Sequence, residues 1–243
     1  MSHKQTRAKT FVALISAVGL CAIGYALTLA NTWHPGEAAA LFAIAVAASR
    51  MKVKLPGLTG TMSVNLPFLL LAVAALNLAE ALVVACVSIA AQSWPKDGTK
   101  PKLVQVLFNV SSVASATALG WRIFHQGTNG APIWFSGALL MPSAVLGFFL
   151  MQTVPVSTVI ALTDGGRIWR TWTIIVRMTF PYYVSSAGMA FMVMAARRQV
   201  GWQLPLLLLP VAYGIYRSYQ MYFAASAAEL SSLNTAKAAH AGQ

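Results

Sequence analysis

Long apolar runs recur along the whole of this chain, with only short polar connections between them. Of its 243 residues, 58% are hydrophobic and 9% are charged, and only five side chains are acidic. A soluble globule covers its surface with polar side chains, and this composition supplies too few of them. We therefore expect an all-α fold in lipid: a polytopic transmembrane helical bundle.

The apolar runs predict eight helical spans, or seven if one of the short runs does not cross, since a crossing needs about 20 apolar residues. The expected spans are residues 10–31, 37–49, 64–78, 80–94, 103–124, 133–162, 174–196 and 202–223. The second to fourth are short, which suits helices sheltered among neighbours. The sixth is too long for one crossing and carries Pro142 and Pro155, so we expect a kinked helix that continues past the membrane surface.

The basic residues predict the orientation of the bundle. With the N-terminus in the cytoplasm, eight spans place all but three of the 17 basic residues at cytoplasmic ends; the exceptions are Arg122, Arg197 and Arg198. This bias is typical of bacterial inner membrane proteins, whose cytoplasmic loops are rich in Lys and Arg. Both termini are therefore expected in the cytoplasm. Tryptophans near most span ends fit the headgroup layer, where indoles prefer to lie.

Two segments are not expected to span. Residues 51–63 contain Pro and Gly and alternate in polarity, which predicts an extended connector on the cytoplasmic side. The chain then divides into an integral membrane domain, residues 1–223, and a short cytoplasmic tail, residues 224–243, rich in small residues. The apolar run after the basic start is too long for a typical signal peptide and predicts an uncleaved first span.

Several classes of function are disfavoured by the sequence. The net charge of +12 is scattered between apolar runs, whereas nucleic-acid binders concentrate theirs, so no nucleic-acid partner is expected. The two cysteines lie inside apolar runs, and the four histidines show no spacing that would hold a metal. Sequence motifs for a catalytic nucleophile, a phosphate loop or a carboxylate pair are missing. We expect no enzyme activity, no metal and no cofactor.

Polar residues at membrane depth are the candidate functional residues, because each is costly unless it is paired or has a function. Gln105, Asn109 and Ser112 share one face of the fifth span, which predicts either an interhelical hydrogen-bonding seam or one wall of a small-ligand pocket. Tyr182 and Tyr183 follow Pro181, where a helix kink frees a carbonyl group; this pattern fits packing or ligand binding.

Glu80 is the acidic residue nearest to a span interior, in the tight turn between the third and fourth spans. We expect a carboxylate at a helix N-terminus, favoured by the helix dipole and exposed to water on the outer face. A proton or cation site is the alternative, although such sites in transporters usually include further acids.

Three stretches together resemble the multi-span N-terminal membrane region of bacterial HD-GYP and GGDEF signalling proteins. They begin with KLPGLTGTMSVNLPFLLLAVAALNLAE, continue with VQVLFNVSSVASATALGW and end with LLLLPVAYGIYRSYQMYF, and an FPYY motif precedes the last. The resemblance implies a sensory or anchoring module whose last span passes a conformational change to a cytoplasmic output domain. The positions that match the family pattern are Pro67, Phe108, Asn109, Pro181, Tyr182, Tyr183, Tyr216, Arg217 and Tyr219. No HD or GGDEF domain follows in this sequence, so we expect the module to act through a separate partner, to be a remnant, or to have a function within the membrane itself.

Three functions are consistent with these observations. The first is a stand-alone sensor or scaffold of the cytoplasmic membrane that binds a small or lipidic ligand, or a partner protein, among its helices. Tyr216, Arg217 and Tyr219 would then couple the last span to a cytoplasmic or membrane signalling partner. The second is a substrate-binding membrane subunit or small transporter, and the third is a structural subunit of a membrane complex. In each case the lipid bilayer is the surrounding partner.

Overall fold

The computed structural model describes residues 3–29, 33–54, 61–94, 102–126 and 139–200, together with the short stretches 210–211, 213–214, 216–218, 220–221 and residue 224. These residues form helices and one two-stranded sheet. The elements are α1 (His3–Thr28), α2 (Pro35–Ser49), β1 (Lys52–Lys54), β2 (Thr61–Ser63), α3 (Leu66–Ala75), α4 (Leu78–Ser93), α5 (Leu103–Gln126), α7 (Met141–Asp164) and α8 (Ile168–Val200).

Each of the first seven expected spans coincides with one helix, so the helical fold is confirmed for the described residues. Within them, three helices are long and apolar enough to cross a membrane: α1, α5 and α7. The shorter apolar helices are α2, α3 and α4. The eighth expected span, residues 202–223, and the tail lie almost entirely outside the described residues. The number of crossings and the sides of the termini stay predictions.

The structure refines two expectations. The sixth span was expected from residue 133, but α7 begins at Met141, and residues 133–138 lie outside the described residues. Pro142 sits in the first turn of α7, where its missing N–H would have no helical partner in any case, so the helix needs no kink there. Pro155 does lie inside the helix. At the two ends of the expected extended connector, β1 and β2 pair antiparallel, with Lys52 opposite Ser63, and residues 55–60 lie outside the described residues.

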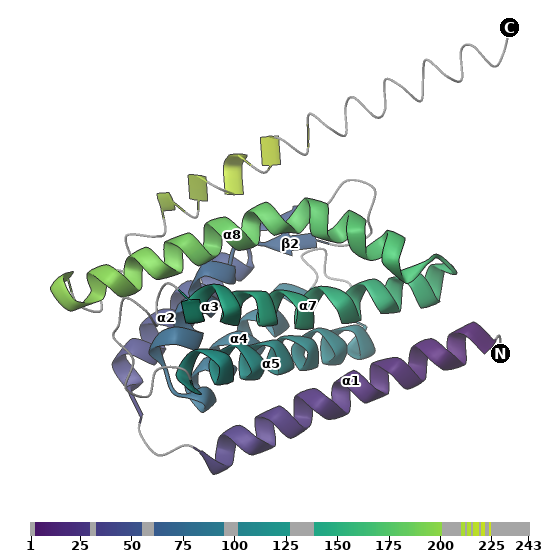
Figure 1. The fold of residues 1–243 in the computed structure, drawn as a ribbon, viewed down its shortest axis with the longest axis horizontal. Helices are drawn as coiled ribbons and strands as arrows, with labels where there is room; N and C mark the ends of the chain where they lie inside the picture. The colour runs from purple at the N-terminus through teal and green to yellow at the C-terminus, as the bar shows by residue number, and fades with distance from the viewer. Residues whose placement is uncertain are drawn as a thin grey trace, which may run out of the picture.

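The long helices lie side by side, with α1 along one edge of the bundle and α8 toward the opposite edge, where the short described stretches between residues 210 and 224 lie beyond it (Figure 1). α5 packs against α1, α4 and α7, and α7 packs in turn against α8. The short helix α3 is enclosed: all of its first nine residues are buried, and it contacts α2, α4, α5 and α8. This sheltered position is how an apolar helix of 10 residues, too short to cross a bilayer, is stabilised.

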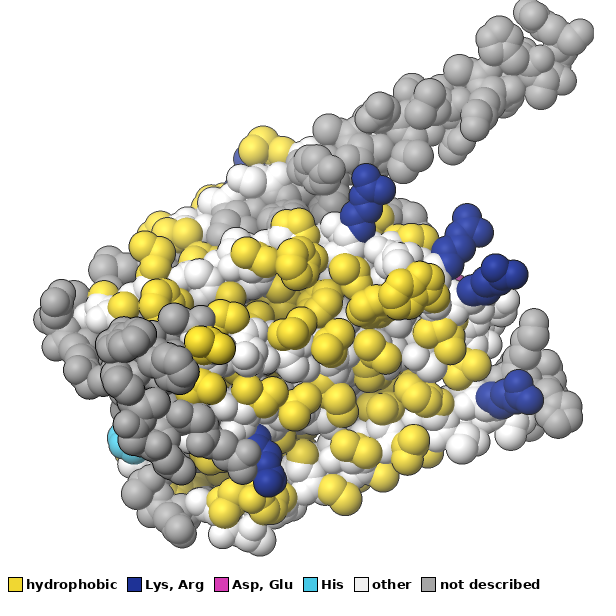
Figure 2. All heavy atoms as spheres, in the orientation of Figure 1, with side chains coloured by type: hydrophobic (Ala, Val, Ile, Leu, Met, Phe, Trp, Pro, Cys, Tyr) yellow, Lys and Arg dark blue, Asp and Glu magenta, His cyan; other side chains and the backbone are white. Residues whose placement is uncertain are grey.

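The outward faces of the bundle are apolar. Leu103 is 78% exposed, and Leu27 and Met192 are each 71% exposed. Apolar side chains are spread across the face shown in Figure 2, while most of the Lys and Arg side chains in this view lie toward the end where α7 turns into α8. Large apolar surfaces of this kind belong against hydrocarbon or another protein. The surface therefore agrees with the lipid environment inferred from composition.

α1 is held by a close helix–helix approach. A Cβ atom added at Gly19 would lie 2.5 Å from the Cα of Ser111 on α5, so only glycine fits this contact. Small residues commonly allow such approaches between helices in membranes. Farther along, Ala26 of α1 packs with Leu78 and Ala114 in a second, smaller core.

Candidate functional site: a buried polar cluster at the start of α3

The first turn of α3 has a backbone donor that the helix itself cannot satisfy. Asn65, at the N-cap position, makes no side-chain cap, although its carbonyl accepts from Phe68 N and Leu69 N, both at 3.1 Å. Pro67 has no N–H to offer. The N–H of Leu66 instead donates to the hydroxyl of Tyr182 on α8, at 3.1 Å.

Tyr182 joins the middle of α8 to the junction between β2 and α3. Its hydroxyl accepts from Leu66 N and donates to the carbonyl oxygen of Ser63, also at 3.1 Å. The side chain is only 2% exposed. Pro181 precedes it inside α8 and cannot donate the usual helical hydrogen bond. A change at the β2–α3 junction can therefore reach α8 at a point where that helix is already weakened.

A chain of side-chain hydrogen bonds continues from this junction. Ser63 Oγ lies 2.7 Å from both Asn65 Oδ1 and Gln92 Oε1, and Asn65 Nδ2 donates to Ser88 Oγ at 3.4 Å. A hydroxyl has one proton, so Ser63 can donate to only one of the two amides at a time. At the other contact the amide must present its NH₂ group. We call Ser63, Asn65, Ser88, Gln92 and Tyr182 the polar cluster.

The C-terminal end of α4, next to the polar cluster, is surrounded by further polar groups. Asn109 of α5 donates to Ser93 Oγ at 3.2 Å. Arg50 Nη1 donates to the carbonyl of Ala91 at 3.1 Å, and Lys52 Nζ donates to that of Trp94 at 2.9 Å. Basic side chains on the last carbonyls of a helix are favoured by its dipole.

The structure separates the residues predicted to bind a ligand. On α5, Asn109 bonds to α4, Ser112 Oγ donates to Gln152 Oε1 of α7 at 2.8 Å, and Gln105 is exposed. The expected stripe therefore forms an interhelical seam to two different neighbours at Asn109 and Ser112. Whether these residues also line a ligand pocket stays a prediction.

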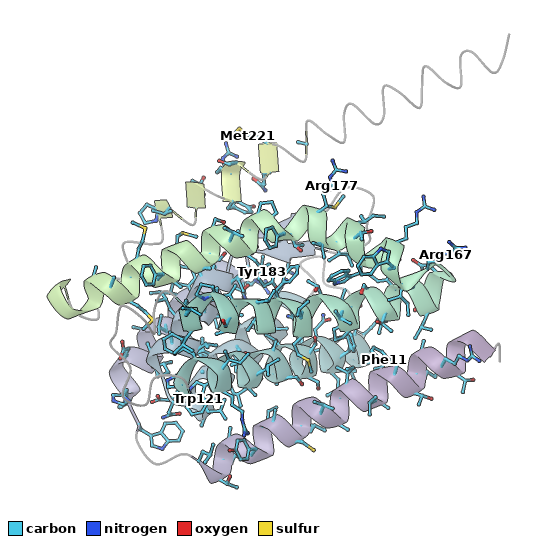
Figure 3. All side chains as sticks on the ribbon, in the orientation of Figure 1. Phe11, Trp121, Arg167, Arg177, Tyr183 and Met221 are labelled. Atoms are coloured by element: carbon cyan, nitrogen blue, oxygen red, sulfur yellow. The ribbon has the colours of Figure 1, made fainter. Side chains whose placement is uncertain are left out.

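The two adjacent tyrosines have different surroundings. Tyr183 points from α8 into the bundle (Figure 3), where its ring centroid lies 4.8 Å from that of Phe149 and 6.5 Å from that of Phe148. Tyr182 belongs to the polar cluster and Tyr183 to an aromatic contact between α7 and α8. Helical spacing turns consecutive side chains by about 100°, so neighbours in sequence meet different elements.

The predicted coupling residues are described only in part. Tyr216 is partly buried against the main core, and its hydroxyl accepts from Gln220 Nε2 at 2.6 Å. Arg217 is exposed. Tyr219 lies outside the described residues. Their role in coupling stays a prediction.

Glu80 is a helix N-terminal carboxylate, as expected, but the expectation that it is exposed to water is wrong, because it is 2% exposed. It forms a capping box with Asn77: Asn77 Oδ1 accepts from Glu80 N at 2.8 Å, and Glu80 Oε2 accepts from Asn77 N at 3.3 Å. Its other oxygen accepts from the backbone N–H of His34 at 2.5 Å. Trp121 Nε1 closes the same turn by donating to the carbonyl of Leu76 at 3.0 Å. These bonds are structural.

Sequence reasoning missed three serines of this region: Ser63, Ser88 and Ser93. One available signal was the spacing of Ser88 and Gln92, four residues apart and thus on one face of α4. The chemistry that the polar cluster offers is neutral hydrogen bonding by hydroxyls and amides. Among the described residues, no group of three or more His, Cys, Asp or Glu side chains could hold a metal.

One further hydroxyl lies close by along α8. Ser186, one helical turn after Tyr182, is fully buried, and its Oγ has no hydrogen-bond partner among the described residues. Of the two carbonyls within its reach in the same helix, that of Tyr182 already accepts from Ser185 Oγ at 3.0 Å. A buried hydroxyl without a partner is costly, so this one is available to a bound polar group.

Comparison with known proteins gives one result. A family model, MASE9, matches residues 11–223 and so covers most of the chain. The search of curated proteins and the search of solved structures each find no match. Together with the apolar helices, the match establishes that the chain belongs to MASE9, a family of membrane-associated sensor domains.

Proposed function

We propose that this protein is a multi-pass sensor or scaffold module of the bacterial cytoplasmic membrane, which binds a small or lipidic ligand, or a partner protein, among its helices. The observation that carries the proposal is the polar cluster, because it joins four elements of a membrane sensor domain through exchangeable hydrogen bonds: β2, α3, α4 and α8. The basic end of the bundle faces the cytoplasm in this proposal.

The sensing step is a competition for hydrogen bonds. A ligand with donors and acceptors takes over one amide of the cluster, Asn65 or Gln92, and the hydroxyl of Ser63 turns to the other. The cost is small because one hydrogen bond replaces another. The β2–α3 junction then moves relative to Tyr182, and α8 changes its tilt or bend at Pro181. A cytoplasmic partner of the HD-GYP or GGDEF kind reads this change through the segment that carries Tyr216 and Arg217.

The test compares two glutamine variants of the full chain. Gln92→Leu removes an amide of the polar cluster, whereas Gln105→Leu removes an exposed amide from the stripe on α5. Each protein is purified in mild detergent, and its co-purifying small molecules and lipids are identified by mass spectrometry. We expect a compound that the parent and Gln105→Leu retain and that Gln92→Leu loses.

A second measurement tests whether binding reaches α8. Adding back that compound should change backbone hydrogen exchange around Tyr182 in the parent but not in Gln92→Leu. The proposal is contradicted if both variants retain the same compounds as the parent, or if the exchange of α8 does not respond. The first result favours a purely structural subunit, since its interior would need no ligand.

A further inference from the structure

Arg177 lies at an unusual depth in the bundle. On α8 it falls between Trp172, whose Nε1 donates to Thr153 Oγ1 of α7 at 3.2 Å, and Tyr183, whose ring contacts Phe149 of α7. Arg177 is therefore level with the central turns of α7, a helix long and apolar enough to cross a membrane. Its side chain is exposed and points away from the bundle (Figure 3).

A charged side chain at this depth needs a partner or a path to the headgroups. Within the described residues, the guanidinium group of Arg177 makes no hydrogen bond or ion pair, and the same is true of the guanidinium group of Arg170. The two are seven residues apart, so they share one face of α8 and are separated by about 10 Å along the helix axis. Arg170 is exposed and lies nearer the basic end of the bundle. Arg177 can extend toward it along the helix surface.

The same face of α8 is apolar on the far side of Arg177. At three- and four-residue intervals it continues through Pro181, Val184, Gly188 and Met192, all exposed. Val184 is 54% exposed and Met192 71%. From Arg177 to Met192 this line is about 22 Å long, more than the roughly 15 Å of hydrocarbon in one leaflet.

We propose that this outward face of α8, defined by Arg170, Ile174, Arg177, Val184 and Met192, binds an anionic phospholipid. The two guanidinium groups hold the phosphate, which matches their planar array of donors. One acyl chain then follows Val184 and Met192. A phospholipid is the occupant because positive charge and apolar length follow one another along a single line, in the order of headgroup and chain. The site is separate from the polar cluster, since Tyr182 leaves α8 on its buried side.

The experiment measures lipid binding to the full chain in detergent by native mass spectrometry. Phosphatidylglycerol and phosphatidylcholine with identical acyl chains are titrated against the parent and three variants. The variants are R170Q/R177Q, the charge-conserving R170K/R177K, and R122Q. The last removes an exposed arginine near the C-terminal end of α5, away from α8 in the sequence.

We expect the parent to prefer phosphatidylglycerol. A basic residue near an anionic lipid surface contributes about fivefold in affinity, so R170Q/R177Q should bind phosphatidylglycerol about 25-fold more weakly. Phosphatidylcholine has the same phosphate but offsets its charge with a quaternary ammonium group, so its binding should fall by less. R170K/R177K should keep most of the preference, and R122Q all of it. If the double glutamine variant is not monodisperse, the single variants R170Q and R177Q should each lose about fivefold.

Several results would overturn the proposal. The parent could bind both lipids equally, or the glutamine variants could bind phosphatidylglycerol as tightly as the parent. An equal loss in R122Q would show a general effect of charge and no site on α8. Finally, sn-glycerol 3-phosphate should fail to displace the lipid at equal concentration, and displacement by it would mean that the apolar line makes no contribution.

Discussion

The two ends of α4 are both rich in polar groups, yet they are built differently. At the N-terminal end, Glu80 accepts hydrogen bonds from the backbone of Asn77 and of His34. At the C-terminal end, Ser88 and Gln92 bond to other side chains, and one hydroxyl is shared between two amides. The first end has a carboxylate on fixed backbone donors, and the second has neutral side chains that can exchange partners.

The difference shows which end of α4 can respond to a signal. A backbone N–H cannot turn toward a new acceptor, so loss of Glu80 would take the acceptor from two fixed, partly buried donors. Side-chain amides and hydroxyls can rotate toward new partners and so keep the same number of hydrogen bonds. The N-terminal end of α4 is therefore an anchor for α2 and α5, and the C-terminal end is where a ligand can act at low cost.

The largest effect is expected at the anchor. Glu80→Ala removes the capping box and the carboxylate that accepts from two partly buried backbone N–H groups, those of Asn77 and His34, at a cost of about 3 kcal/mol. For a chain of this size the midpoint of thermal unfolding should fall by roughly 6–12 °C. Asp164→Ala is the control, because that carboxylate is exposed at the end of α7 and should leave the midpoint unchanged. Equal midpoints of thermal unfolding for Glu80→Ala and Asp164→Ala would show that Glu80 contributes no more to stability than an exposed carboxylate.

Tyr182→Phe should have the next largest effect. It deprives Leu66 N of its acceptor and Ser63 O of a donor, in a buried place, which costs about 2 kcal/mol. Tyr183→Phe is the matched control on the same helix, because its ring packs on Phe149 and its hydroxyl makes no hydrogen bond among the described residues. Thermal unfolding of the two variants in one detergent compares them. If Tyr183→Phe lowers the midpoint of thermal unfolding more than Tyr182→Phe does, the hydrogen bonds of Tyr182 do not hold α8 to the β2–α3 junction.

Asn109→Ala should have the smallest effect on stability. It removes one partly buried bond to Ser93, which contributes about 1 kcal/mol, and membrane insertion should be unaffected. As a candidate ligand residue, it should nevertheless weaken the retention of the co-purifying compound. Quantitative mass spectrometry of parent and variant checks this point. Equal retention would confine Asn109 to the helix–helix seam.

The sequence was sufficient to predict the helices but not the polar cluster. Periodic apolar runs predicted α1 and α5 within a few residues at most ends, and the Asn77–Glu80 pair marks the start of α4 as a capping box does. The burial of Glu80 could not be predicted, because it depends on the N-terminus of α2 lying against α4. Ser63 and Tyr182 are 119 residues apart, and only tertiary packing brings them together.

The axial position of Arg177 in the bundle could not be predicted from the sequence either. The sequence placed it near a cytoplasmic span end, because the apolar stretch of α8 begins at about that position. Its level in the bundle depends on how far α8 slides along α7, and aromatic contacts such as Phe149–Tyr183 fix that register. Sequence periodicity gives the face of a helix but not the axial position of one helix against another.

The most direct test of the account is the side of the membrane that each end of the bundle faces. In a background with Cys21→Ser and Cys86→Ala, single cysteines replace Gly36 and Arg167, which are exposed at the start of α2 and before α8. A Cβ atom at Gly36 meets nothing within 4 Å, so this substitution fits. The account predicts that a membrane-impermeant maleimide labels Gly36→Cys in intact cells and Arg167→Cys only after permeabilisation. Labelling of both from the same side, or recovery of the protein in the soluble fraction, would contradict it.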